Sequence, residues 1–202
     1  MPVVPEPFLD LVTASHWTYL VLFAFAALDS ILPAVPSETA LITAGVLAGT
    51  GRLDLFFVIA AGALGAWVGD NTSYLLGRKV GQPVRRRFFD GEKARRRLTW
   101  AREQLDKRGM YIIVVARFIP GGRTATTFTA GLVHYPWATR FVPATIVAAL
   151  IWASYASLLG YAGGKVFVDK PLLALGVALA FAFGVVAVVE IVRKLRRTRE
   201  AT

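Results

Sequence analysis

The segment MYIIVVARFIPGGRTATTFTAGLV, residues 110–133, decides the fold of this chain. Its two apolar halves are separated by RFIPGGR, residues 117–123. Proline ends a helix and adjacent glycines allow a sharp turn, so one continuous helix is not expected here. Two arginines facing lipid would be very costly, and this backbone should therefore be buried in protein or line a wet cavity. The pattern predicts a re-entrant hairpin, which enters a membrane and returns to the same side.

The surrounding sequence is typical of a membrane protein. Of its 202 residues, 55% are hydrophobic, and none is cysteine, which excludes thiol-ligated metals and disulfide scaffolds. Residues 141–164 and 171–189 carry no charge, and about 20 apolar residues suffice to span a bilayer. Two further spans, each with one aspartate, are predicted at residues 17–35 and 55–77.

Positive charge is concentrated in two stretches. Residues 78–108 contain 12 Lys and Arg, and residues 193–199 contain 5, of 23 in the chain. The positive-inside rule places both stretches in the cytoplasm. An even number of membrane crossings must then lie between the two basic stretches. The spans at 141–164 and 171–189 already provide two, so residues 110–133 should not cross the membrane but re-enter. A soluble nucleic-acid binder has no use for such spans, so the net charge of +10 does not indicate that class.

A second proline-marked segment, residues 33–51, also predicts a re-entrant hairpin. Counting crossings back from the first basic stretch, it enters from the outside, and the N-terminus is cytoplasmic. TAG at 43–45 recurs at 129–131, and LLG at 75–77 recurs at 158–160, with offsets of 86 and 83 residues. Hairpins entering from opposite sides make this an inverted repeat, as in many secondary transporters. The predicted fold is all-α and polytopic, with about four transmembrane helices and two opposed re-entrant hairpins.

The second hairpin carries a candidate anion site. Arg117 and Arg123 flank its turn, and the planar fork of a guanidinium matches the oxygens of phosphate. Between them, Gly121 and Gly122 can add backbone N–H groups in an anion-binding nest. We therefore expect these residues to bind an anionic headgroup.

Three acids are candidates for proton or cation coupling. Asp29 and Glu38 lie at the first hairpin, and they would face the two arginines if the hairpin tips meet near the midplane. The alternative is that these charges only neutralise one another and hold the hairpins together. Asp70 shares a helix face with Tyr74, and both a packing role and a proton-relay role are open for it. No spacing resembles a metal site or a catalytic triad, and no cofactor is predicted.

Residues 90–109 are predicted to form a surface helix against the anionic inner leaflet, or a solvated loop. Asp90 is the expected N-cap and Gly109 the expected stop. The apolar face consists of Ala94, Leu98, Ala101 and Leu105.

These motifs resemble the DedA family, whose members share the VTT domain. The resemblance covers residues 25–165 in order and differs at Asp29, where the family usually has Glu. Its motifs are DSILPAVPSE at 29–38 with Gly45 and Gly51, GDNTSYLLGRKVG at 69–81, RFIPGGR at 117–123 with Ala130, Gly131 and Phe141, and Trp152 with GYAGG at 160–164.

The resemblance implies one multi-pass membrane domain over residues 1–202 in the bacterial inner membrane. It implies lipid movement between leaflets, of undecaprenyl phosphate or phospholipids, in some members dependent on the proton-motive force. It also implies that Asp29, Glu38, Arg117 and Arg123 match family residues needed for function. A last span at 171–192 with a basic tail would leave the C-terminus in the cytoplasm.

The leading hypothesis is thus a translocase for an anionic lipid rather than an enzyme, with a proton or sodium ion as coupling partner and no nucleic acid. The alternative is a proton- or sodium-coupled transporter of a small soluble solute. A membrane enzyme such as a lipid phosphatase would need a nucleophile beside the arginines, for which Thr124 is a candidate. A structural or regulatory protein would use the basic surface to recruit partners. The sequence sets no oligomeric state.

Overall fold

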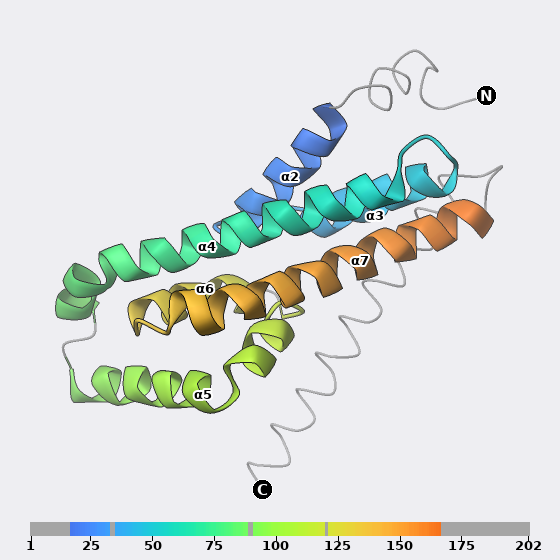
Figure 1. The fold of residues 1–202 in the computed structure, drawn as a ribbon. Helices are drawn as coiled ribbons and strands as arrows, with labels where there is room; N and C mark the ends of the chain where they lie inside the picture. Colours follow the sequence, from blue (N-terminus) through green and yellow to red (C-terminus); the bar gives the residue numbers. More distant parts are fainter. Residues whose placement is uncertain (1–16, 33–34, 89–90, 120, 167–202) are drawn as a thin grey trace, which may run out of the picture.

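The computed structural model describes residues 17–32, 35–88, 91–119 and 121–166 (Figure 1). Regular structure in these ranges is entirely helical, as predicted. The last predicted span, at 171–192, and its basic tail lie outside the described residues. The helices are α2 (Trp17–Asp29), α3 (Ser37–Gly49), α4 (Leu55–Phe88), α5 (Glu92–Ala116), α6 (Gly122–Leu132), the short π-helix η1 (Trp137–Phe141) and α7 (Val142–Val166).

Two antiparallel helices form the centre of the molecule. Within the described residues, the segments Leu55–Val80 and Trp137–Lys165 are long and apolar enough to cross a membrane, which agrees with the spans predicted at 55–77 and 141–164. Figure 1 shows α4 and α7 side by side and running in opposite directions. Tyr74 in the second half of α4 accordingly meets Phe141 just before α7, with ring centroids 4.5 Å apart.

The span predicted at 17–35 is not a continuous helix. α2 ends at Asp29 after 13 residues, which rise only about 20 Å, less than the roughly 30 Å of a hydrocarbon core. The chain then turns, and α3 begins at Ser37 after Pro36, because two prolines in this stretch lack the N–H groups that would continue a helix. The first hairpin is therefore formed by α2 and α3, with its tip at residues 30–36.

The first hairpin therefore begins earlier in the chain than the predicted segment 33–51. The first residues of α2 lie beside the start of α4, where the Asp54 N–H donates to the Tyr19 hydroxyl at 3.1 Å. α2 thus runs away from the start of α4, and α3 returns towards it, so the pair begins and ends at the same end of α4. The prediction of a cytoplasmic N-terminus counted residues 17–35 as a full crossing. Residues 1–16 lie outside the described ranges, so the side on which the N-terminus lies stays a prediction.

The second hairpin is formed by the end of α5 and by α6. Its turn is sharp, as predicted, and Gly121 before α6 has a left-handed backbone with φ of 69°. The predicted surface helix is the first part of α5, with Leu105 buried and Leu98 half-buried. Asp90 lies outside the described residues, and Gly91 holds the N-cap position. α5 consists of two helices that meet at a kink at Arg108, where φ is −140° and ψ is 28°. The predicted surface helix therefore ends beside the expected stop at Gly109, and the second helix continues into the hairpin (Figure 1).

The helices that carry the repeated tripeptides pack across the two repeats, so that α3 lies on α7 and α6 lies on α4. Gly45 of the first TAG lies against the α7 turn that leads to Gly160 of the second LLG, and Gly131 of the second TAG lies against the α4 turn before Gly77 of the first LLG. At each of these four glycines an added Cβ would overlap a main-chain carbonyl oxygen of the facing helix. Each hairpin helix is therefore packed backbone to backbone on the long helix of the other repeat.

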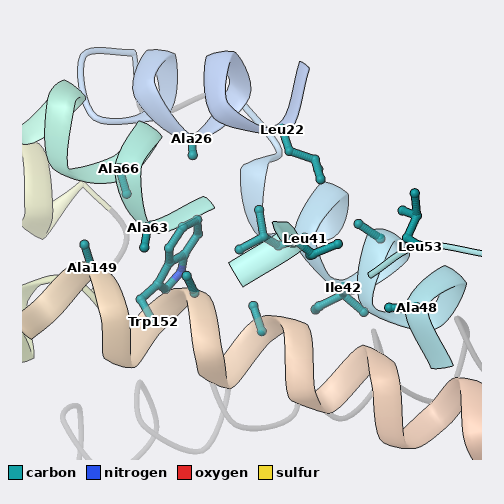
Figure 2. Packing of buried hydrophobic residues seen from close by; sticks show 14 residues of the cluster. Leu22, Ala26, Leu41, Ile42, Ala48, Leu53, Ala63, Ala66, Ala149 and Trp152 are labelled. Atoms are coloured by element: carbon teal, nitrogen blue, oxygen red, sulfur yellow. The ribbon is translucent and has the colours of Figure 1, made fainter. Parts of the chain in front are cut away.

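Two apolar clusters lie along the α4–α7 pair. One is formed by α2, α3, α4 and α7, and Figure 2 shows its Leu41 and Ile42 on α3 near Trp152 on α7. The other surrounds Tyr74 and Phe141. On α4, the last cluster residue on one side is Ala66 and the first on the other is Tyr74. The charged site lies in the gap between them.

Candidate functional site

Asp70 is the centre of a buried cluster of ion pairs. Its side chain is completely buried on α4. Arg117 Nη1 donates to its Oδ2 at 2.6 Å, and Arg123 Nε donates to its Oδ1 at 2.7 Å. One carboxylate on α4 thus holds both ends of the RFIPGGR turn. The sequence placed Asp70 at membrane depth but did not indicate this pairing.

Arg123 is fully engaged and joins the two hairpins. Its Nη1 donates to Asp29 Oδ2 at 3.1 Å, at the end of α2. Its Nη2 donates to the carbonyl oxygen of Ala66 at 3.0 Å and to the hydroxyl of Ser30. Each nitrogen of this guanidinium therefore has a partner. Arg123 fastens the tip of the second hairpin to the tip of the first and to α4.

Arg117 is buried but only partly engaged. Its side chain is 2% exposed, and Nη1 is bound to Asp70. Its Nε and Nη2 are buried and have no hydrogen-bond partner within the described part of the chain. Buried donors without partners cost free energy, most of all on a charged group. The Nε–H and Nη2–H groups lie along one edge of the guanidinium, the arrangement that binds two oxygens of a phosphate or carboxylate side by side. The site thus contains an unused anion-binding edge.

Trp152 on α7 borders both arginines. The Cζ atoms of Arg117 and Arg123 lie 5.2 Å and 5.7 Å from the centroid of its ring, within the roughly 6 Å of a cation–π interaction. Figure 2 shows the indole extending from α7 towards Ala63 on α4. Trp152 also belongs to the apolar cluster of α2, α3, α4 and α7, so its ring lies where this cluster meets the two guanidiniums. In the sequence, Trp152 was notable only as part of the resemblance.

The acids differ in their relation to the arginines. Asp29, 21% exposed, pairs with Arg123 and also accepts a hydrogen bond from the Ser37 hydroxyl at 2.8 Å. Glu38 is half-buried and has no hydrogen bond or ion pair among the residues the structure describes. The expected meeting of two acids with two arginines is thus made by Asp29 and Asp70, whereas Glu38 remains free beside it.

Gly121 and Gly122 set the shape of the turn. Gly121 has nothing within 4 Å of an added Cβ, so its left-handed φ, not a lack of space, calls for glycine. The N–H of Gly122 already donates to the Ile119 carbonyl oxygen at 2.8 Å. That N–H is therefore not available to an anion. The supporting hydroxyls of Ser30 and Ser37 were missed, and their only sequence signal is their position beside Asp29 and Glu38.

Comparison with known proteins places this site in a family. The model of the VTT domain matches residues 35–162, which include Glu38, Asp70, both arginines and Trp152. The chain belongs to the DedA family of VTT-domain membrane proteins. No solved structure matches it.

Similar proteins in this family come from several bacteria. The chain is 30% identical over 151 residues to the "uncharacterized membrane protein ML0287" of Mycobacterium leprae, covering 74% of this chain and 66% of that protein. It is 28% identical over 191 residues to the protein DedA of Escherichia coli, covering 92% and 87%. It is 32% identical over 129 residues to the inner membrane protein YohD of Escherichia coli, covering 64% and 65%.

Proposed function

We propose that this DedA-family protein is a lipid translocase, which moves an anionic lipid such as undecaprenyl phosphate or a phospholipid between membrane leaflets. The observation that carries the proposal is the unused edge of Arg117. A phosphate that accepts hydrogen bonds from Nε and Nη2 would satisfy both buried donors at once. Arg123, whose nitrogens are already engaged, would position the turn and add positive charge beside the phosphate.

In this proposal the cluster lies near the membrane midplane. Asp70 is close to the middle of the segment Leu55–Val80, and Trp152 is close to the middle of Trp137–Lys165. With α4 and α7 antiparallel and the hairpins packed crosswise, the two repeats are inverted about an axis in the membrane plane. The α2–α3 hairpin would enter from the outside and the α5–α6 hairpin from the cytoplasm. Their tips meet at Arg123.

The outer surface of the hairpins would let lipid tails stay in the bilayer. Large apolar side chains are exposed along both hairpins and along α7, although the charged cluster itself is closed. A headgroup could then reach Arg117 between the tips while its tail remains in hydrocarbon. These exposed side chains include Leu20, Val21 and Phe25 on α2, Val115 and Phe118 at the second hairpin, and Ile146, Leu150 and Ile151 on α7.

Proton coupling follows from the charge count. Asp29 and Asp70 balance Arg117 and Arg123, so the cluster is neutral before a ligand binds. A bound phosphate adds negative charge in a poorly solvated place, and uptake of a proton by Glu38 or Asp29 would offset it. Glu38 suits this role because it has no hydrogen bond or ion pair to another described residue that protonation would break. A sodium ion at the same carboxylates would have the same electrostatic effect.

The test is transbilayer movement of labelled undecaprenyl phosphate in proteoliposomes. Arg117→Lys keeps the charge but removes the planar edge, and loss of a charge-assisted hydrogen bond costs about 1.5–3 kcal/mol, roughly a 10- to 100-fold lower rate. The matched control is Arg102→Lys on the exposed face of α5, which should move lipid at the wild-type rate. Wild-type activity in Arg117→Lys would contradict the proposal.

The enclosure of Arg117 also favours a second candidate function. A compact anionic solute would fill the same edge without a tail, and the protein would then be a proton- or sodium-coupled solute transporter. Uptake of labelled phosphate into proteoliposomes, with no movement of lipid, would support this alternative.

A further inference from the structure

An open cavity lies at the kink of α5, away from the ion-pair cluster. Its volume is about 640 Å³, it is open to the surface, and it is bordered by α5, by the residues after α6 and by η1. Arg108 at the kink and Arg117 at the cluster are nine residues apart, about 14 Å at 1.5 Å per residue. None of the residues that line it belongs to the site described above.

Backbone geometry builds this cavity. Arg108 leaves helical geometry, and at the next residue, Gly109, an added Cβ would overlap the hydroxyl of Tyr135. Gly109 therefore lets α5 rest directly on the segment after α6. That segment is itself constrained, because His134 has φ of 57°, a conformation uncommon outside glycine. The cavity is thus a defined recess of the fold.

One side of the cavity carries uncompensated positive charge. Arg140 is neutralised by Asp106, whose Oδ1 accepts from its Nη1 at 3.3 Å. Lys107 and Arg108 are exposed, and neither forms an ion pair within the described ranges. Within the described residues, the lining thus contains three cations and one carboxylate, which leaves a net positive charge. An anion is the ligand that this charge distribution favours.

The other side of the cavity is apolar and exposed. Met110 is 48% exposed and Tyr111 is 66% exposed, and Val114 follows one turn later in the same lining. A free phosphate or a nucleotide would leave these side chains uncovered. A phospholipid has a phosphate for the two cations and the start of an acyl chain for the apolar side chains. Anionic lipids of the cytoplasmic leaflet attract basic residues at the membrane surface.

We propose that this recess binds the phosphate headgroup of an anionic membrane lipid, held by Lys107 and Arg108 with its upper acyl chains against Met110 and Tyr111. The site rests on its own lining and not on the translocase proposal. If lipid translocation also holds, the recess is the place where the lipid docks before its headgroup moves along α5 to Arg117.

The test measures lipid binding to the purified full chain by native mass spectrometry, titrated with phosphatidylglycerol, phosphatidylcholine or inorganic phosphate. Lys107→Gln/Arg108→Gln is compared with Arg96→Gln/Arg97→Gln, which removes the same charge from the exposed part of α5 outside the cavity. The cavity pair should weaken phosphatidylglycerol binding roughly 10- to 30-fold, and the control pair less than about 2-fold. Wild-type protein should bind phosphatidylcholine and inorganic phosphate much more weakly than phosphatidylglycerol.

Three results would overturn the proposal: an equal loss in both pairs, no loss in the cavity pair, or inorganic phosphate binding as tight as phosphatidylglycerol. Met110→Ser gives an independent check without changing charge, and it should also weaken phosphatidylglycerol binding. Arg117→Lys separates the two proposals, because it should slow translocation while leaving phosphatidylglycerol binding at the recess unchanged.

Discussion

Replacing Asp70 by Asn should destabilise the protein more than any exposed charge change. The carboxylate is completely buried and is the single ionic partner that Arg117 has among the described residues. Asn keeps the shape of the side chain but removes its charge, so Arg117 becomes a buried cation without an ionic partner. Removing one partner of a buried ion pair costs about 3–5 kcal/mol. At about 2–4 °C per kcal/mol for a chain of this size, the apparent Tm should fall by roughly 6–20 °C.

The assay is thermal unfolding of the purified protein in detergent, followed by circular dichroism. The matched control is Asp106→Asn, which breaks the ion pairs of a 45% exposed carboxylate with Arg102 and Arg140. Exposed pairs are worth about 0–1 kcal/mol, so this variant should unfold within a few degrees of wild type. The comparison separates loss of a buried countercharge from loss of any aspartate.

A double variant tests the cause. Asp70→Asn combined with Arg117→Met removes both partners, and the remaining Asp29 and Arg123 still balance each other. Replacing a buried ion pair by apolar groups is often close to neutral, so the double variant should regain more than half of the Tm lost in Asp70→Asn. The reasoning is refuted if Asp70→Asn unfolds like Asp106→Asn, or if adding Arg117→Met restores nothing.

Further predictions concern packing, the aromatic border and the turn. Gly131→Ala should cost about 1–3 kcal/mol of stability, because its methyl group would overlap main chain of α4. The control Gly91→Ala meets nothing within 4 Å and should cost less than about 1 kcal/mol, the effect of a poorer N-cap; equal Tm values for the two variants would contradict the packing of α6 on α4. Trp152→Phe should retain more lipid transport than Trp152→Leu, since an aromatic ring preserves the cation–π contact of about 0.5–2 kcal/mol with the arginines. Equal transport rates in the two variants would show that this contact does not contribute to transport. Gly121→Ala should cost about 1–2 kcal/mol through its left-handed backbone, and an unchanged Tm would show that the turn tolerates another conformation.

The parts of the fold that could be predicted are those that depend on local chemistry. The length of charge-free sequence identified α4 and α7, and Pro120 with its two following glycines identified the second turn. The first hairpin was placed too late, because the apolar run from residue 17 to residue 28 is equally compatible with a short helix and with the start of a full span. Asp29 and the two prolines end it, but only the packing of α2 on α4 shows that it turns back.

The site could be predicted in part from the sequence for the same reason. Arg117 and Arg123 stand out because charge inside an apolar segment is costly, and the sequence is enough to say that they need partners. It does not say which acid they take, since Asp29, Glu38 and Asp70 are all plausible at membrane depth. That choice depends on how α4 lies against the two hairpin tips. The unused edge of Arg117 follows from the same arrangement and has no signature in the sequence.

In the proposed function, a lipid phosphate is recognised at the buried Nε–Nη2 edge of Arg117. The most direct test is protein-dependent transbilayer movement of two labelled lipids that differ only in the phosphate, undecaprenyl phosphate and undecaprenol, in proteoliposomes with wild-type protein. We expect the protein to accelerate movement of undecaprenyl phosphate and to leave undecaprenol at the rate of protein-free vesicles. Equal acceleration of both lipids, or of neither, would contradict it.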